Sequence, residues 1–178
     1  MTHFELATLQ AGLPEVRKSP ADAGRVELIV RRPADDQREV VVEGELSTDA
    51  GLVGDKWSVA RDGVEPNPDA QLTLMNARVA TLVAGRPDHG GLAGDQLYVD
   101  LDLSDENLPP GTRLAVGRAV IEVTAEPHTG CGSFARRFGV DALKFVNSRD
   151  GRALNLRGIN TKVIIGGIVR PGDVIAKL

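Results

Sequence analysis

Several residue types are scarce in this sequence, and each scarcity excludes a class of protein. Only one of the 178 residues is cysteine, which excludes an intramolecular disulfide and a zinc site built from several thiolates. One Trp, one Tyr and four Phe are too few to form a stacking platform for bases. A net charge of −4 and a pI near 5.4 do not favour a general nucleic-acid binder either. We therefore expect no nucleic-acid partner.

Long apolar runs are also missing. The first twenty residues contain no continuous hydrophobic stretch, which predicts neither a signal peptide nor a membrane span. The apolar content of 42% and charged content of 26% are typical of a globular protein, and 178 residues suit one domain. We expect a cytoplasmic protein without a membrane partner.

The common catalytic motifs are absent too. The three histidines show no HExxH or HxxxH spacing for a metal on a helix, and no GxSxG segment marks a nucleophilic serine. None of the glycine-rich segments is followed by the Lys-Ser/Thr pair of a phosphate loop. The repeated segments GLVGD (51–55) and GLAGD (91–95) are instead typical of turns in which aspartate bonds the local backbone, with a ligand role as the alternative.

Eight short segments with β-type patterns are distributed along the chain. They occupy residues 25–32, 38–46, 71–75, 96–103, 112–117, 119–126, 162–169 and 173–178. Strand and helix do not alternate as a doubly wound sheet requires, so the pattern predicts a mainly β, closed or nearly closed barrel with short helices. Residues 1–24 contain helix-breaking glycine and prolines, and we interpret them as a leader packing on a single barrel domain of residues 25–178.

The principal predicted helix places the only thiol at its start. Phe134, Phe138 and the apolar residues that follow have helical spacing from residue 133 to about 146. Cys131, flanked by two glycines, therefore lies where free N–H groups and the helix dipole favour an anion. This position lowers a thiol's pKa and favours a nucleophile or soft-metal ligand. The alternative is an inert, buried cysteine.

Several basic residues lie near the thiol in the sequence. His128 shares its loop and could accept its proton or, when protonated, stabilise the thiolate. Arg136 and Arg137 follow it, and Arg152 and Arg157 lie in the loop before the last strands. Arginines bind phosphate oxygens in bidentate fashion, so these side chains indicate a pocket for an anionic small molecule; a solvated surface is the alternative.

The order of several motifs resembles the MOSC domain, the domain named from the C-terminal part of molybdenum cofactor sulfurases, which also occurs as free-standing bacterial proteins. The resemblance covers roughly residues 25–177. It depends on VELIVRRP, the turn GLVGDKW, the segment QLTLMNARV, the Asn107-Leu108 pair, VGRA at 116–119, the single cysteine after AVIEV, and the closing GGIVRPGDVI.

The resemblance implies a mixed, mostly β barrel whose pocket binds the molybdenum cofactor or a sulfur-bearing species. The family's cysteine corresponds to Cys131, which would ligate molybdenum or carry a sulfane sulfur. Asn107 and the four arginines would then contact the pterin. Some family members reduce N-hydroxylated compounds. The pyridoxal-phosphate domain of the full sulfurases is not expected in this chain.

Three functions follow from this reading. The first is a protein that binds the molybdenum cofactor through Cys131, and such a protein could be a small oxidoreductase. The second is a metal-free sulfur carrier or thiol enzyme using Cys131 and His128. The third is a non-catalytic module for an anionic metabolite or a protein. A redox protein or a sulfurtransferase is the candidate protein partner for the first two.

Overall fold

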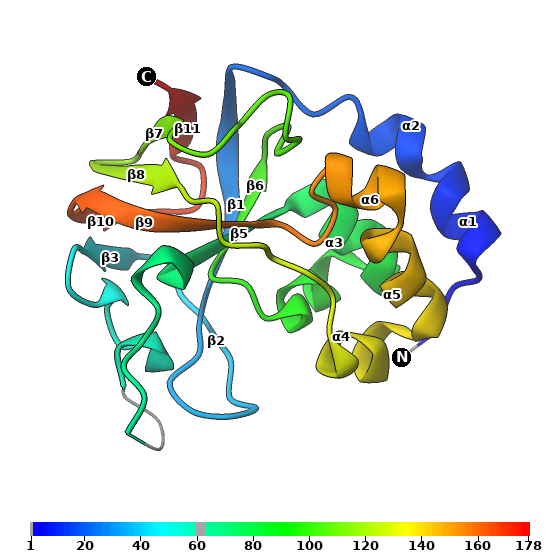
Figure 1. Ribbon diagram of the computed structural model, residues 1–178, viewed down its shortest axis with the longest axis horizontal. Coiled ribbons are helices and arrows are strands. Elements are labelled where there is room, and N and C mark those ends of the chain that lie inside the picture. Colours follow the sequence, from blue (N-terminus) through cyan, green and yellow to red (C-terminus); the bar gives the residue numbers. More distant parts are fainter. Residues whose placement is uncertain (1, 60–62) are drawn as a thin grey trace.

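A closed β-barrel and an adjoining layer of helices make up the molecule. The computed structural model describes residues 2–59 and 63–178, except for the side chains of residues 87–89. The barrel strands are β1 (Ala23–Arg31), β5 (Leu72–Asn76), β6 (Leu97–Asp100), β7 (Arg113–Val116), β8 (Ala119–Val123), β9 (Ile159–Ile165) and β11 (Val174–Lys177). Figure 1 shows these strands on one side of the molecule and most of the helices on the other. The mainly β barrel predicted from the sequence is therefore confirmed.

The barrel closes because β1 pairs with two strands. The strand order is β11-β7-β8-β9-β5-β6-β1, and β1 also pairs with β11. Every neighbouring pair in this ring is antiparallel except β5 and β6, which are parallel and are connected through α3 (Ala77–Ala84). The short strand β2 (Glu39–Val40) extends the sheet from β1. A separate small sheet has the order β10 (Gly167–Val169), β3 (Gly44–Ser47), β4 (Gly51–Leu52).

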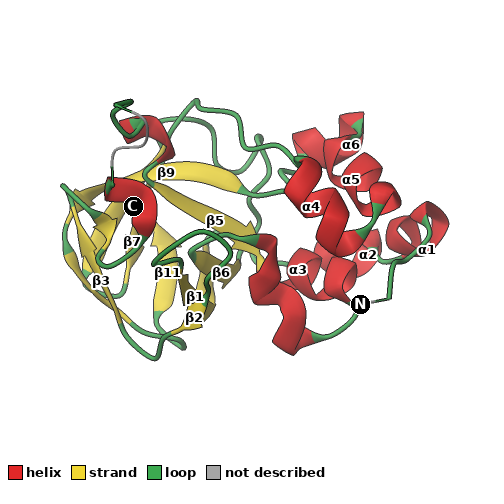
Figure 2. Ribbon diagram, turned by 90° about the horizontal axis from the view of Figure 1, so that it is seen from below, coloured by secondary structure: helices red, strands yellow, loops and turns green. Residues whose placement is uncertain are grey.

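The remaining helices are short. They are α1 (Leu6–Ala11), α2 (Leu13–Val16), α4 (Gly132–Phe138), α5 (Val140–Asn147) and α6 (Arg149–Ala153), with 3-10 turns η1 (Lys56–Ser58), η2 (Pro68–Ala70) and η3 (Pro87–Ala93). Figure 2 shows the α-helices gathered beside the barrel. None of the helices in the described part of the chain is long and apolar enough to cross a membrane.

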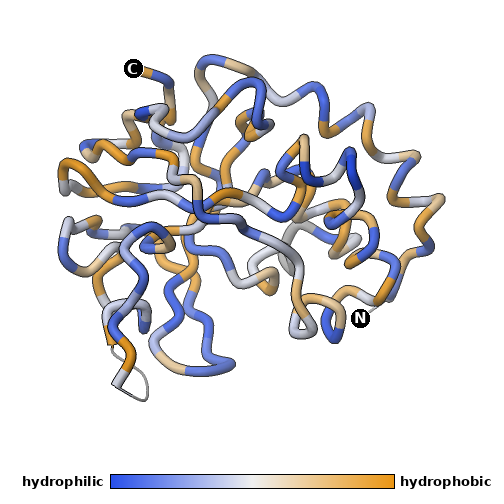
Figure 3. The backbone as a smooth tube through the Cα atoms, in the orientation of Figure 1, coloured by the Kyte–Doolittle hydropathy of each residue, from blue (hydrophilic) through white to orange (hydrophobic). Residues whose placement is uncertain are grey.

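Two hydrophobic cores correspond to these two layers. The barrel interior is filled by aliphatic side chains such as Leu74, Val99 and Ile121. The buried aromatic side chains all belong to the second core, between the helices and the outer face of the barrel: Tyr98, Phe134, Phe138 and Phe145. Figure 3 shows hydrophobic segments in both layers. The few aromatic residues of this sequence thus serve mainly to attach helices to the barrel.

The predicted helix over residues 133–146 is two helices in the structure. Gly139, with φ 94° and ψ 162°, ends α4 and begins α5. This backbone region is accessible almost only to glycine, so the chain changes direction there although the apolar spacing continues. The predicted strand at 38–46 is likewise divided, into β2 and β3.

The leader contacts both layers. Helix α1 lies against α5, where the Leu6 N–H donates to the Asp141 carboxylate at 3.2 Å. After the helices, the carbonyls of Pro20 and Asp22 accept hydrogen bonds from the N–H groups of Asp102 and Lys177. These contacts connect the leader to the helical layer and to the barrel strands.

Candidate functional site

The loop after β8 carries Cys131 to the first turn of α4. Cys131 is the N-cap residue, and its side chain is exposed. Partial burial disfavours the thiolate, but the nearby backbone N–H groups of Phe134 and Ser133 and the charge of Arg157 favour it more strongly. The pKa of Cys131 is therefore lower than that of an ordinary cysteine. The structure thus gives an accessible thiol that ionises readily.

The preceding residue fixes this loop against α5. The Asn147 side chain accepts from the Gly130 N–H at 2.9 Å and donates to the Gly130 carbonyl at 3.0 Å. A Cβ at Gly130 would lie 2.8 Å from a methyl group of Leu143. Glycine at this position therefore allows the loop to pack closely against α5.

A buried ionic network lies beside the thiol. Asp95 is completely buried; its carboxylate accepts from Arg157 Nη1 at 2.6 Å and contacts His128 Nε2 at 2.7 Å. Arg157 also donates to the Ala93 carbonyl at 3.1 Å and lies 5.2 Å from the centre of the Phe134 ring. Burial alone would raise the pKa of Asp95, but the charges of Arg157 and His128 hold it well below its usual range.

The two repeated GD segments have equivalent roles. Gly54 and Gly94 have φ of 82° and 97°, so both are turns that favour glycine. Asp55 accepts two hydrogen bonds from the Arg32 guanidinium, at 2.9 and 2.8 Å, as well as the local N–H of Trp57. Arg32 also donates to the Gly94 carbonyl at 2.8 Å. Both segments are thus turns, as predicted. The local backbone bond is present at Asp55, whereas the Asp95 carboxylate is bound by the distant His128 and Arg157.

More positive charge gathers around the Gly94 turn. A Cβ built on Gly94 would lie 3.5 Å from Arg38 Nη2 and 3.8 Å from Arg137 Nη1. Arg137 contacts the Leu92 carbonyl and the highly exposed Asp36. The Nε of Arg38 is buried without a hydrogen-bond partner among the described residues, and burial together with the charge of Arg137 lowers the Arg38 pKa. We call Arg38, Arg137 and Arg157 the arginine cluster.

The other residues predicted for the site lie in three different places. Arg136 is exposed at α4, where it donates to Ser133 Oγ at 2.7 Å. Arg152, on α6, lines a separate cavity of about 270 Å³ together with His128. The Asn107 amide donates to the carbonyls of Ala21 and Asp102 and accepts from Lys177, none of which belongs to the Cys131 site.

The sequence predicts that His128 accepts the Cys131 proton or stabilises the thiolate, but in the structure His128 is bound to Asp95 instead. The ring nitrogen Nε2 of His128 contacts Asp95, and no hydrogen bond joins His128 to Cys131 in the described part of the structure. His128 instead supports the carboxylate that holds Arg157. Arg157 is the charged side chain that acts on the thiol.

Sequence reasoning missed Asp95 and Arg38. The repetition of GLxGD was visible in the sequence, and it was the available signal for Asp95. Arg38 carries no comparable signal, because the β1–β2 turn brings it to Gly94 from a distant part of the chain. Residues 2–59 and 63–178 contain no group of three or more His, Cys, Asp or Glu side chains placed to hold a metal ion.

Comparison with known proteins shows the fold of this chain. No family model and no curated protein matches the sequence. Among solved structures, YuaD from Bacillus subtilis is similar with a TM-score of 0.64 and 16% identity, over 86% of this chain and 94% of YuaD. YiiM from Escherichia coli has a TM-score of 0.57 and 20% identity, over 86% of this chain and 69% of that one.

YiiM from Geobacillus stearothermophilus is also similar, with a TM-score of 0.55 and 14% identity over 89% of this chain and 73% of that one. YuaD and YiiM are MOSC-domain proteins. The barrel and the helices beside it therefore have the fold of a free-standing MOSC-type domain.

Proposed function

We propose that this chain binds the molybdenum cofactor, with the Cys131 thiolate as the protein ligand of the metal. The observation that carries the proposal is an exposed thiol whose pKa is lowered in part by Arg157, with Arg38 and Arg137 at the Gly94 turn beside the Asp95 that holds Arg157. Thiolate is a soft donor suited to such a metal, and arginine suits the phosphate of the pterin.

The residues present are compatible with this group. The cofactor brings its metal on its own pterin, so one protein thiolate can complete the binding without a cluster of metal-ligating side chains. The buried Nε of Arg38 and that of Arg157 have no hydrogen-bond partner among the described residues. Donors of this kind favour an anionic ligand, because an unsatisfied buried polar group is costly.

Each protein group has a definite task in this proposal. Arg157 stabilises the Cys131 thiolate, and Asp95 holds Arg157 through the 2.6 Å ion pair. Arg38 and Arg137 would contact the phosphate. When bound, the cofactor would supply a redox-active metal at the thiol. A protein that exchanges electrons with the metal would be the corresponding partner.

Elemental analysis of protein purified from a host that makes the cofactor tests this proposal. We expect molybdenum in the wild type, none in Cys131→Ser, and at least a tenfold lower content in Arg38→Gln. Arg118→Gln is the control, because Arg118 is an exposed arginine in the β7–β8 turn. Absence of molybdenum from the wild type, or equal loss in Arg118→Gln, would contradict the proposal.

A metal-free sulfur carrier is the second candidate, and the accessibility of the thiol favours it. In such a transfer the Cys131 thiolate attacks the outer sulfur of a donor persulfide, such as that of a sulfurtransferase. A new S–S bond forms at Cys131 while the donor's S–S bond breaks and the donor leaves as a thiolate. Mass spectrometry would then find one added sulfur on Cys131 and no bound metal.

The arginine cluster also supports a third candidate, a non-catalytic module that binds an anionic metabolite or an acidic protein segment. In that case the ligand would remain bound in Cys131→Ser and be lost in Arg38→Gln. The two variants therefore separate this function from both thiol-dependent ones.

A further inference from the structure

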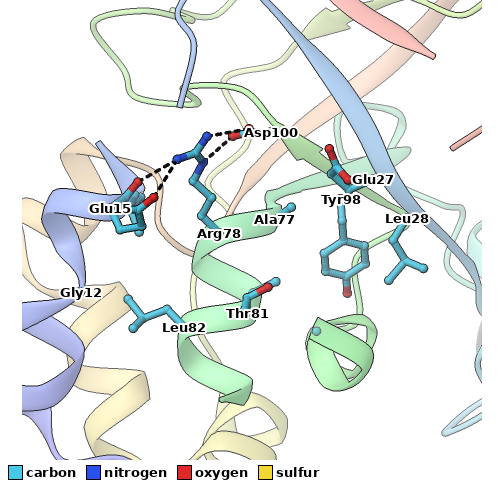
Figure 4. Close-up of a pocket in the computed structure, with 13 residues that line it drawn as sticks. Gly12, Glu15, Glu27, Leu28, Ala77, Arg78, Thr81, Leu82, Tyr98 and Asp100 are labelled. Atoms are coloured by element: carbon cyan, nitrogen blue, oxygen red, sulfur yellow. Dashed lines mark hydrogen bonds and ion pairs between the residues drawn. The ribbon is translucent and has the colours of Figure 1, made fainter. Parts of the chain in front are cut away.

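A second cavity lies between α3, Leu28 of β1 and Tyr98 of β6. Its volume is about 550 Å³, within the range of small-molecule sites. Helix α3 forms one wall, with Thr81 and Leu82, and the facing wall consists of Leu28 of β1 and Tyr98 of β6 (Figure 4). Neither Cys131 nor any residue of the arginine cluster lines it. The cavity is therefore distinct from the site proposed above.

The wall formed by β1 depends on an irregularity in the strand. The pairing register between β1 and β6 shifts between Val26 and Leu28, so Glu27 is an additional residue. Val26 and Ile29 point into the barrel core, whereas Leu28 packs against the helical core. Such a bulge redirects side chains. As a result, the consecutive residues Glu27 and Leu28 both line the cavity.

The lining combines an apolar floor with a negative rim. Val16, Leu28, Ala80 and Leu82 provide aliphatic surface where the helical core is open to solvent. Such a surface favours an apolar group of a ligand over water.

The charges at the rim do not cancel. Arg78 pairs with Asp100 at 2.7 Å and with Glu15 at 3.3 Å, and Glu15 is further paired with Lys18 outside the cavity. Glu27 forms no hydrogen bond or ion pair within residues 2–59 and 63–178. Arg78 is paired with Asp100, and Arg25, which lines a neighbouring cavity with Glu27, donates to the Gly172 carbonyl at 3.2 Å. A free carboxylate thus remains above an apolar cavity.

We propose that this cavity binds an amphipathic organic ammonium ion, with the ammonium group at Glu27 and the apolar group between α3 and Tyr98. Charge complementarity selects a cation over an anion, because a carboxylate ligand would meet Glu27, Asp100 and Glu15. The apolar walls select an alkyl or aryl amine over an inorganic cation. The thiol of Cys131 takes no part in this binding.

Three probes of nearly the same shape test the charge preference. 4-Phenylbutylamine, 4-phenylbutanol and 4-phenylbutyrate are titrated into ¹⁵N-labelled protein while the backbone amide resonances are followed. We expect saturable shifts confined to α3, β1 and β6 with the amine, and at least tenfold weaker binding of the carboxylate. The alcohol should lie between them. A higher salt concentration should weaken the binding of the amine, because it screens the ion pair with Glu27, and should not weaken the binding of the alcohol.

Variants test the residues. Glu27→Gln should weaken the binding of the amine about three- to fivefold, as expected for loss of a solvent-exposed ion pair. The affinity for the alcohol should not change. Glu45→Gln is the matched control, because Glu45 is an exposed glutamate on the distant strand β3. Thr81→Phe should fill the cavity and abolish the binding of all three probes; Ala77→Leu serves the same purpose if Thr81→Phe does not fold.

Several results would overturn this proposal. They are equal binding of the amine and the carboxylate, shifts located outside the cavity, equal effects of Glu27→Gln and Glu45→Gln, or no saturable binding at millimolar amine. If the chain self-associates and the amine therefore fails to bind, the proposal is also overturned, and the cavity would belong to an interface between two copies. Cys131→Ser should bind the amine like the wild type, which keeps this test independent of the thiol site.

Discussion

Cys131 differs from an ordinary surface cysteine through three interactions that favour its thiolate. The N–H groups of Ser133 and Phe134 in the first turn of α4 favour its thiolate, and Arg157 adds a positive charge from a distant loop. The sequence makes the first of these predictable, because the glycines and the helical spacing after Cys131 are visible in it. The contribution of Arg157 depends on its ion pair with Asp95, which only the fold brings about.

We predict that Cys131 is alkylated in the native protein with an apparent pKa below the value of about 8.5 for free cysteine. The direction follows from the N–H groups and Arg157, which stabilise the thiolate more than partial burial disfavours it. The measurement is the rate of reaction with iodoacetamide against pH, with the same protein in denaturant as the reference. Cys131→Ser should melt within a few degrees of the wild type, because the side chain is exposed. A native pKa at or above the denatured one would contradict this.

The buried network shows why residue-level prediction was incomplete. A buried aspartate in a turn cannot be distinguished by sequence from an exposed aspartate that bonds its local backbone. Asp95 is of the first kind and its partners lie 33 and 62 residues away. Long-range ion pairs of this type leave no periodic pattern.

At the level of elements, the strands were predictable and the breaks between helices were not. The period-2 segments at 71–75, 112–117 and 119–126 became β5, β7 and β8, because alternation directly reflects one face in the barrel core. The apolar spacing through 133–146 is preserved across Gly139, since α4 and α5 both bury side chains in the same helical core. The apolar spacing therefore indicates that both helices pack on the same core, but it does not reveal the turn at Gly139 between them.

We predict that Gly139→Ala destabilises the protein by about 1–3 kcal/mol, because its backbone conformation is strained for any residue with a Cβ. That Cβ would also lie 3.0 Å from the Cβ of His3. Gly132→Ala is the control: a Cβ there would meet only Arg136, at 4.0 Å, and alanine favours the helix by up to about 1 kcal/mol. Urea unfolding of both variants gives the comparison. Equal stability of the two variants would show that Gly139 is not required at the break.

For the whole molecule, closure of the barrel depends on its last strand. Ile175 is fully buried and lies opposite Gly24 of β1 and Val116 of β7, so it belongs to both pairings of β11. We predict that Ile175→Ala lowers the free energy of unfolding by about 2–5 kcal/mol. The adjacent Val174 is 56% exposed, and Val174→Ala should change stability by no more than about 0.5 kcal/mol. A similar loss in both variants, measured by urea unfolding, would contradict the assigned alternation.

The dependence of stability on pH should reflect the same long-range organisation, because Asp95 joins the η3 segment to the loops carrying His128 and Arg157. Folding lowers the pKa of Asp95 below the value of about 3.9 in an unfolded chain. Near pH 4 the unfolded chain therefore binds more protons, so the stabilisation is fully present above that pKa and decreases as the pH falls toward the folded value.

We predict that Asp95→Asn destabilises the protein by about 3–5 kcal/mol at pH 7, because it leaves the buried Arg157 without its counter-charge. The difference from the wild type should decrease as the pH is lowered from 5 to 3, where the wild-type carboxylate itself begins to lose its advantage. Urea unfolding at several pH values measures this difference. Asp141→Asn is the control, since the pKa of Asp141 is also lowered, chiefly by Lys144, but at a half-exposed position that solvent screens. A difference that stays constant between pH 7 and pH 3 would mean that the Asp95 charge does not stabilise the fold and that its contribution is one of packing alone.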